Sequence, residues 1–126
     1  MSELSEEVKI FLLESLENLE NAEQEVLSIE QHFSPGSIAP IFRSVHTIKG
    51  NAGFLGYVKL ETLCHRAESL LDLLRNGKKP FSSDTATVLL AFIDTTRDLL
   101  RRIENQQDDS SVSTDDILRS LEQASQ

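Results

Sequence analysis

The sequence predicts an all-α protein: an antiparallel up-and-down four-helix bundle with a short C-terminal fifth helix. Four long segments carry apolar residues at three- and four-residue steps, and prolines, glycines and serines gather between them. Strand-like alternation and internal repeats are absent from the sequence. With 126 residues, 39% of them hydrophobic, the chain is large enough to bury one core. Short turns between amphipathic helices favour antiparallel neighbours, which gives the bundle.

The first helix is predicted to run to about Gln31, with Ser5 or Ser2 as its N-cap. Its apolar residues follow the helical repeat and mark the face that turns to the core. They are Val8, Phe11, Leu12, Leu16, Leu19, Ala22, Val26 and Ile29.

The second helix follows a break at residues 34–37, where a Pro-Gly pair interrupts the pattern. It is predicted to begin near residues 37–38 and to hold Pro40 in its first turn, where proline is tolerated. Gly53 and Gly56 mark its end.

The third helix is predicted after Tyr57 and Val58, and Asn76-Gly77 ends it. Its inward residues are Leu60, Leu63, Ala67, Leu70, Leu71 and Leu74. The fourth is predicted from about Asp84 to Asn105. Its apolar side consists of Val88, Leu89, Phe92, Ile93, Leu99, Leu100 and Ile103.

The predicted organisation is a bundle over residues 1–105, a polar and flexible link over 106–113, and an accessory helix and tail over 114–126. Thr114 is predicted to cap a last helix over residues 115–124. The residues expected to dock it are Ile117, Leu118 and Leu121.

Composition excludes several classes of protein. The net charge of −9 argues against a nucleic-acid binder, whose affinity depends on Lys and Arg. No apolar stretch approaches the roughly 20 residues that span a bilayer, and the acidic start is unlike a signal peptide. Cys64 has no partner for an internal disulfide, so we expect a cytoplasmic protein with a buried thiol.

Charge is unevenly distributed along the chain. Residues 1–31 have a net charge of −8 and residues 80–126 of −5, whereas residues 41–79 have a net charge of +4. Such a basic region would favour a phosphoryl group and an acidic partner site. Ordinary scatter of surface charge would give the same pattern.

One helical stripe in the basic region carries candidate functional residues. From His46, the steps of three, four and seven residues reach Lys49, Gly50 and Gly53. The apolar stripe of the same helix lies well around from it, so His46 should face water. That apolar stripe consists of Ile41, Val45, Ile48, Ala52 and Leu55.

Two glycines inside a helix each cost roughly 0.5–1 kcal/mol relative to alanine. Beside an exposed His46, bare backbone at Gly50 and Gly53 would let a partner's active site approach the imidazole. The alternatives are that the glycines admit a neighbouring helix or that the helix ends early.

The motif resembles a known family. His46-Thr47-Ile48-Lys49-Gly50 and Gly53-Phe54-Leu55-Gly56-Tyr57 are similar to the signature of histidine-containing phosphotransfer (HPt) domains. The likeness is strongest to the N-terminal phosphotransfer domains of chemotaxis histidine kinases of the CheA type. It continues through residues 60–72 and 75–77 and so covers most of the chain.

The resemblance implies a histidine phosphotransfer module of two-component signalling. His46 would be phosphorylated, and Glu68 on the next helix would accept a hydrogen bond from its imidazole. Lys49 would meet phosphoryl oxygens. His65 matches a second histidine of the family site, where it would support the site or remain a plain surface residue.

The implied partners are a histidine kinase catalytic domain and a response-regulator receiver domain. The chain would carry a phosphoryl group without being a self-sufficient enzyme, either as the N-terminal part of a CheA-like kinase supplied by ATP or as a module supplied by a receiver aspartyl phosphate. We expect no cofactor bound by this domain, with Mg²⁺ and ATP in the partner domains, and no metal site, since no suitable ligand spacing occurs. The alternatives are a non-phosphorylated docking module and a metal-binding bundle.

Overall fold

The computed structural model describes residues 4–105 and 108–126, and within these ranges the protein is entirely helical, without strands. Two short 3-10 turns, η1 (Pro35–Ser37) and η2 (Asp109–Ser111), lie between longer helices. Five α-helices account for most of the described residues: α1 (Glu6–Ile29), α2 (Ile38–Leu55), α3 (Val58–Arg75), α4 (Ser83–Glu104) and α5 (Asp115–Ala124). No helix in the described ranges is long and apolar enough to cross a membrane.

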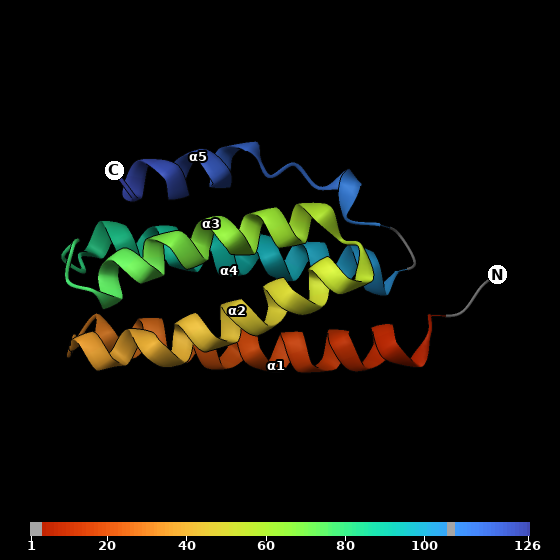
Figure 1. Ribbon diagram of the computed structural model, residues 1–126, viewed down its shortest axis with the longest axis horizontal. Coiled ribbons are helices and arrows are strands. Elements are labelled where there is room, and N and C mark those ends of the chain that lie inside the picture. Colours follow the sequence, from red (N-terminus) through yellow and green to blue (C-terminus); the bar gives the residue numbers. More distant parts are fainter. Residues whose placement is uncertain (1–3, 106–107) are drawn as a thin grey trace.

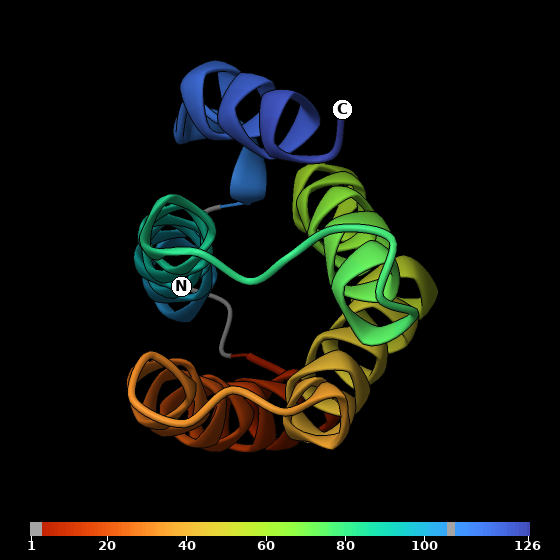
Figure 2. The same cartoon turned by 90° about the vertical axis from the view of Figure 1, so that its left-hand side faces the viewer.

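The first four helices surround a common core. Helix α1 contacts α2 and α4, and α3 contacts α2 and α4, so each helix has two neighbours. Figure 2 shows this ring end on, with α5 lying outside it against α3 and α4. The connections α1–α2, α2–α3 and α3–α4 lie at alternate ends of the molecule (Figure 1).

Most helix boundaries follow the local signals in the sequence. The hydroxyl of Ser5 accepts a hydrogen bond from the backbone N–H of Val8 at 3.2 Å and caps α1. The hydroxyl of Ser82 accepts one from Thr85 at 3.2 Å, so α4 begins at Ser83, one residue before the predicted start. Helix α4 ends at Glu104 and α1 at Ile29, slightly before the predicted ends.

The two glycines at the end of α2 differ in conformation. Gly53 lies inside the helix, and only Gly56 ends it, with a φ of 85° in the left-handed region. The backbone N–H of Tyr57 then bonds to the carbonyl of Ala52 at 2.9 Å, and α3 starts at Val58. The α2–α3 turn is therefore only two residues long.

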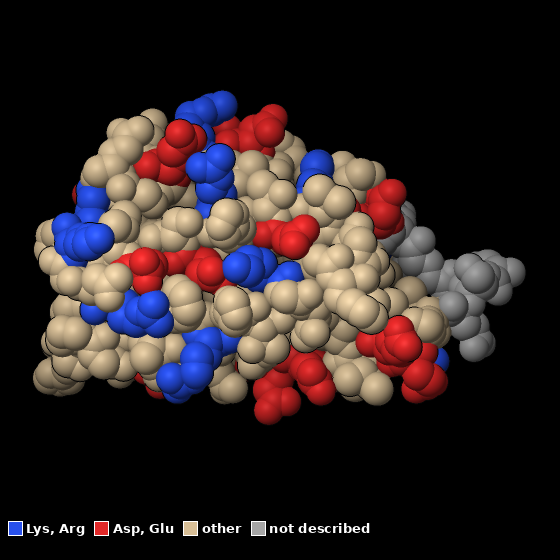
Figure 3. All heavy atoms as spheres, in the orientation of Figure 1, with Lys and Arg blue, Asp and Glu red and all other residues tan. Residues whose placement is uncertain are grey.

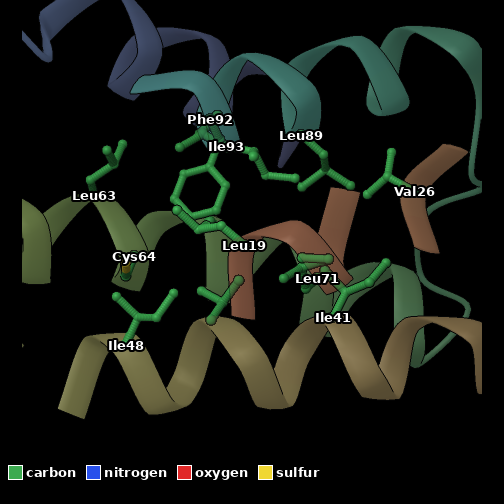
Figure 4. Close-up of a cluster of buried hydrophobic side chains, with 14 of the residues drawn as sticks. Leu19, Val26, Ile41, Ile48, Leu63, Cys64, Leu71, Leu89, Phe92 and Ile93 are labelled. Carbon is green, nitrogen blue, oxygen red and sulfur yellow. The ribbon is translucent and has the colours of Figure 1, made fainter. Parts of the chain in front are cut away.

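The core is formed by the predicted apolar stripes (Figure 4). Five of its large side chains are at most 2% exposed: Leu19, Ile41, Ile48, Leu71 and Phe92. Some predicted core residues are only partly buried and lie at its margin: Val8, Leu16, Leu55, Val88 and Leu118. The core also includes polar side chains that the pattern did not identify, among them Thr96, whose hydroxyl donates to the carbonyl of Phe92 at 2.8 Å.

The segment before α5 is tied to the start of α3. The buried carboxylate of Asp109 accepts a hydrogen bond from the backbone N–H of Leu60 at 3.0 Å. Lys59 donates to the carbonyls of Ser110 at 2.8 Å and Val112 at 2.6 Å. Asp109 thereby satisfies one of the unpaired N–H groups in the first turn of α3, which has no side-chain cap of its own. The sequence predicted a flexible link over 106–113; these contacts join its described part to α3, and its flexibility stays a prediction.

Helix α5 docks through all three predicted residues: Ile117 and Leu121 are buried, and Leu118 is partly buried and packs against the core. Thr114 stands at the N-cap position, as predicted, but its buried side chain makes no capping hydrogen bond. Since the cap is missing, the helix is held by packing against α3 and α4.

Replacing Asp109 with alanine should lower the free energy of unfolding by about 1–2 kcal/mol, because the N–H of Leu60 then lies buried without a partner. Urea unfolding followed by circular dichroism measures this. The matched control is Glu104→Ala, an exposed carboxylate, which should change stability by less than about 0.5 kcal/mol. Equal effects of the two substitutions would show that the Asp109 contact does not anchor the segment.

Candidate functional site

The site is centred on His46, on the solvent side of α2. Its side chain is 61% exposed, whereas Val45 and Ile48 beside it are buried against the core. The 3.6-residue repeat produces this contrast, since the buried and exposed residues occupy different stripes of one helix. His46 faces water, as its position in the pattern predicted.

Glu68 on α3 joins two residues of α2. One of its carboxylate oxygens, Oε2, lies 2.8 Å from Nδ1 of His46. The other, Oε1, accepts a hydrogen bond from Nζ of Lys49 at 2.9 Å. The three side chains thus form one charge-assisted network across the α2–α3 interface.

This network determines the ionisation of Glu68. Its side chain is only 15% exposed, and burial raises the pKa of the carboxyl group. The hydrogen bonds and charges of Lys49 and His46 outweigh burial, so the pKa lies below its ordinary value. At neutral pH Glu68 is therefore a carboxylate, which can only accept hydrogen bonds.

Because Glu68 can only accept, the proton of the hydrogen bond belongs to Nδ1 of His46. In the neutral imidazole the lone pair then lies on Nε2. Within the described residues Nε2 has no hydrogen-bond partner. The site therefore presents one unprotonated ring nitrogen at the surface, which suits a nucleophile.

The imidazole of His46 belongs to a stack with Phe42 and Arg75 that the sequence analysis did not identify. The ring of Phe42, one turn earlier on α2, is stacked on His46 with centroids 6.0 Å apart and planes 9° from parallel. The guanidinium of Arg75 at the end of α3 lies 4.1 Å from the Phe42 centroid. The four-residue step from Phe42 to His46 was visible in the sequence, but the contact with Arg75 depends on tertiary packing.

His65 lies on α3 and is exposed. It lines a shallow surface depression together with Lys49, Thr62 and Arg66. In the described part of the chain its ring has no hydrogen bond or ion pair, so the structure does not bring it into the network of His46 and Glu68.

The two glycines of the motif have different surroundings. A Cβ atom at Gly50 would meet no atom within 4 Å, so the surface is open there. A Cβ atom at Gly53 would overlap with the carboxylate of Glu61 on α3. Gly50 therefore lies on open surface, and access of a partner there stays a prediction, whereas Gly53 lies against the end of the Glu61 side chain.

Surface charge is unevenly distributed over the molecule. On the face in Figure 3, basic side chains lie over α2 and α3 with acidic side chains among them, and a further group of acidic side chains lies at the lower right over the first part of α1. This follows the charge pattern of the sequence, with the basic excess in residues 41–79. In the described ranges, no group of three or more His, Cys, Asp or Glu side chains could hold a metal ion.

The low pKa of Glu68 gives its network a pH dependence. A carboxyl group whose pKa is lower in the folded chain adds stability above its unfolded pKa, about 4.3, and this is lost as the pH falls through the folded value. At pH 7 Glu68→Gln should lower the free energy of unfolding by about 1 kcal/mol. The difference should shrink below about pH 4. Urea unfolding at pH 7, 5, 4 and 3 measures it, and a constant difference would contradict the assignment.

Several known proteins resemble this chain over most of its length. The chain matches the Hpt domain family model over residues 6–106. It is 29% identical over 116 residues to the chemotaxis protein CheA of Bacillus subtilis, covering 88% of this chain and 17% of that protein. It is 30% identical over 123 residues to CheA of Salmonella typhimurium, covering 96% and 18%. The chain thus spans less than a fifth of the length of these relatives.

Among solved structures, the chain resembles the phosphorylated P1 domain of CheA3 from R. sphaeroides, determined in complex with CheY6. The TM-score is 0.87 at 24% identity, with 95% of each chain covered, which establishes the likeness of fold. The family model and the fold together lead to one conclusion: the chain belongs to the Hpt domain family.

Proposed function

We propose that this chain is a histidine phosphotransfer module of two-component signalling and that His46 is its phosphorylated residue. The observation that carries the proposal is the hydrogen bond from Nδ1 of His46 to Glu68, which leaves Nε2 unprotonated and exposed. The scaffold would be the antiparallel up-and-down bundle of α1–α4, which is consistent with their ring of contacts and short connections.

In the reaction, Nε2 of His46 forms a bond to the phosphorus atom of the donor, and the bond from phosphorus to the donor oxygen breaks. The imidazole becomes positively charged as its lone pair is used. The carboxylate of Glu68, 2.8 Å from Nδ1, stabilises this charge without taking part in bond formation. Transfer to an aspartate of a receiver domain reverses these steps.

Lys49 would have two functions. One N–H of its ammonium donates to Glu68 at 2.9 Å and fixes that carboxylate. An ammonium has three such donors, so the others remain for phosphoryl oxygens, whose charge they would offset. His65 would have a supporting function at most, since it lies beside Lys49 in the same depression.

The donor would be either a kinase catalytic domain, which would supply the phosphoryl group from ATP, or a receiver domain that carries an aspartyl phosphate. The acceptor would be the aspartate of a receiver domain. The CheA names of the relatives and the complex of one relative with CheY6 support this proposal. ATP and Mg²⁺ would be bound by the partner domains. A cytoplasmic setting would suit the buried, unpaired Cys64.

The proposal predicts that the chain, mixed with a CheA-type kinase catalytic domain, ATP and Mg²⁺, gains one acid-labile phosphoryl group. His46→Gln should abolish the gain, because no other imidazole in the described residues has its Nδ1 hydrogen-bonded to a carboxylate. Intact mass spectrometry at neutral pH measures it. His65→Gln and His32→Gln are the matched controls and should still be labelled. Labelling that persists in His46→Gln would refute the assigned residue.

Partner access at Gly50 gives a separate prediction. Gly50→Leu should raise the stability of the isolated chain by up to about 1 kcal/mol, because leucine favours the helix and its Cβ would meet no atom within 4 Å. The same side chain should obstruct a docking partner and raise the KM of the kinase domain for the chain at least tenfold. Urea unfolding and labelling kinetics measure the two effects. An unchanged KM would show that no partner approaches this part of α2.

A further inference from the structure

Glu68 alone does not fix the orientation of the imidazole. Its hydrogen bond holds one atom, Nδ1, of a ring that is joined to the backbone through two rotatable bonds, so the tilt of the ring plane is only partly restrained. In-line attack requires a defined direction of the Nε2 lone pair, since small errors in geometry cost large factors in rate. A second restraint on the plane of the ring is therefore needed.

Phe42 has the position to provide that restraint. Its ring lies almost parallel to the imidazole, at 9°, with the centroids 6.0 Å apart, within the range of offset aromatic stacks. Phe42 is itself half-buried against the core, so its own ring is held in place. The guanidinium of Arg75 lies 4.1 Å from the centroid of the Phe42 ring, and Arg75 forms an ion pair with Asp72 at 2.6 Å.

We propose, on the basis of the function proposed above, that Phe42 is a positioning residue for His46 and that Arg75 holds Phe42 in place. Glu68 fixes the proton on Nδ1, and the face of Phe42 fixes the plane in which Nε2 points outward. Phe42 touches no reacting atom, so it acts only through the imidazole. Its removal should slow the chemical step without weakening the docking of a partner.

The first test uses the unphosphorylated chain. In Phe42→Leu, which keeps an apolar side chain, the ring protons of His46 should lose the shift caused by the stacked ring. A ring that is no longer held in its plane should also make a weaker hydrogen bond to Glu68, so the ¹⁵N signals of His46 should move from the Nδ1-protonated tautomer towards an average of the two tautomers. Phe42→Tyr should restore both signatures. Phe54→Leu is the matched control, because Phe54 is 84% exposed on the same helix and has no ring contact in the described residues.

The second test uses phosphorylation kinetics with a kinase catalytic domain. Phe42→Leu should lower kcat roughly tenfold and leave the KM for the chain within about twofold, and Phe42→Tyr should recover the rate. Arg75→Gln should lower kcat about threefold. The double variant should be no slower than Phe42→Leu alone, because both substitutions act through one stack.

The outcomes separate the possibilities. Unchanged tautomer signals and rate in Phe42→Leu would overturn the proposal, and a raised KM with unchanged kcat would make Phe42 a docking contact instead. If Phe42→Leu fails to fold, Arg75→Gln decides, and an unchanged kcat in that variant would count against the stack. If the wild-type chain is never labelled at His46, the proposed function fails, whereas the NMR signatures still test the stack.

Discussion

The site depends on one carboxylate shared between two helices. Glu68 can reach both His46 and Lys49 only if α2 and α3 lie side by side in a fixed register. The turn between the helices supplies that register, because only two residues separate them. Gly56 makes so short a turn possible, since its φ of 85° is a conformation that other residues adopt with strain. The contacts of Glu68 with His46 and Lys49 therefore depend on the backbone conformation of Gly56, at the C-terminal end of α2.

The packing beneath the network keeps the helices close. Ala52 on α2 and Cys64 and Ala67 on α3 are buried small side chains, and small side chains allow a near approach of two helices. Burial raises the pKa of Cys64 to about 12, so its thiol stays protonated and serves only as a small apolar group.

Periodicity alone predicted the helices and the exposure of His46, because both follow from the local repeat and from turn residues. Glu68 entered only through the family resemblance, since no pattern in one sequence tells which glutamate of the next helix faces a given histidine. Tertiary packing also accounts for what was missed. Arg75 meets Phe42 across two helices, and Asp109 reaches Leu60 from a segment that looked like a simple polar link.

Under the proposed function, the two ring nitrogens of His46 would allow one residue both to accept and to hold a phosphoryl group. Glu68 binds Nδ1, so a group on Nε2 lies across the ring from this carboxylate, which limits repulsion between two negative groups. The positive charge of Lys49 would offset both negative groups, because one of its N–H groups donates to Glu68 and the other two remain available. Because the pKa of Glu68 lies below its ordinary value, its carboxylate stays ionised throughout the neutral pH range and continues to accept hydrogen bonds from both side chains. Such a carrier would need no group of its own to break the bond between Nε2 and phosphorus, so the docking partner would determine when transfer occurs.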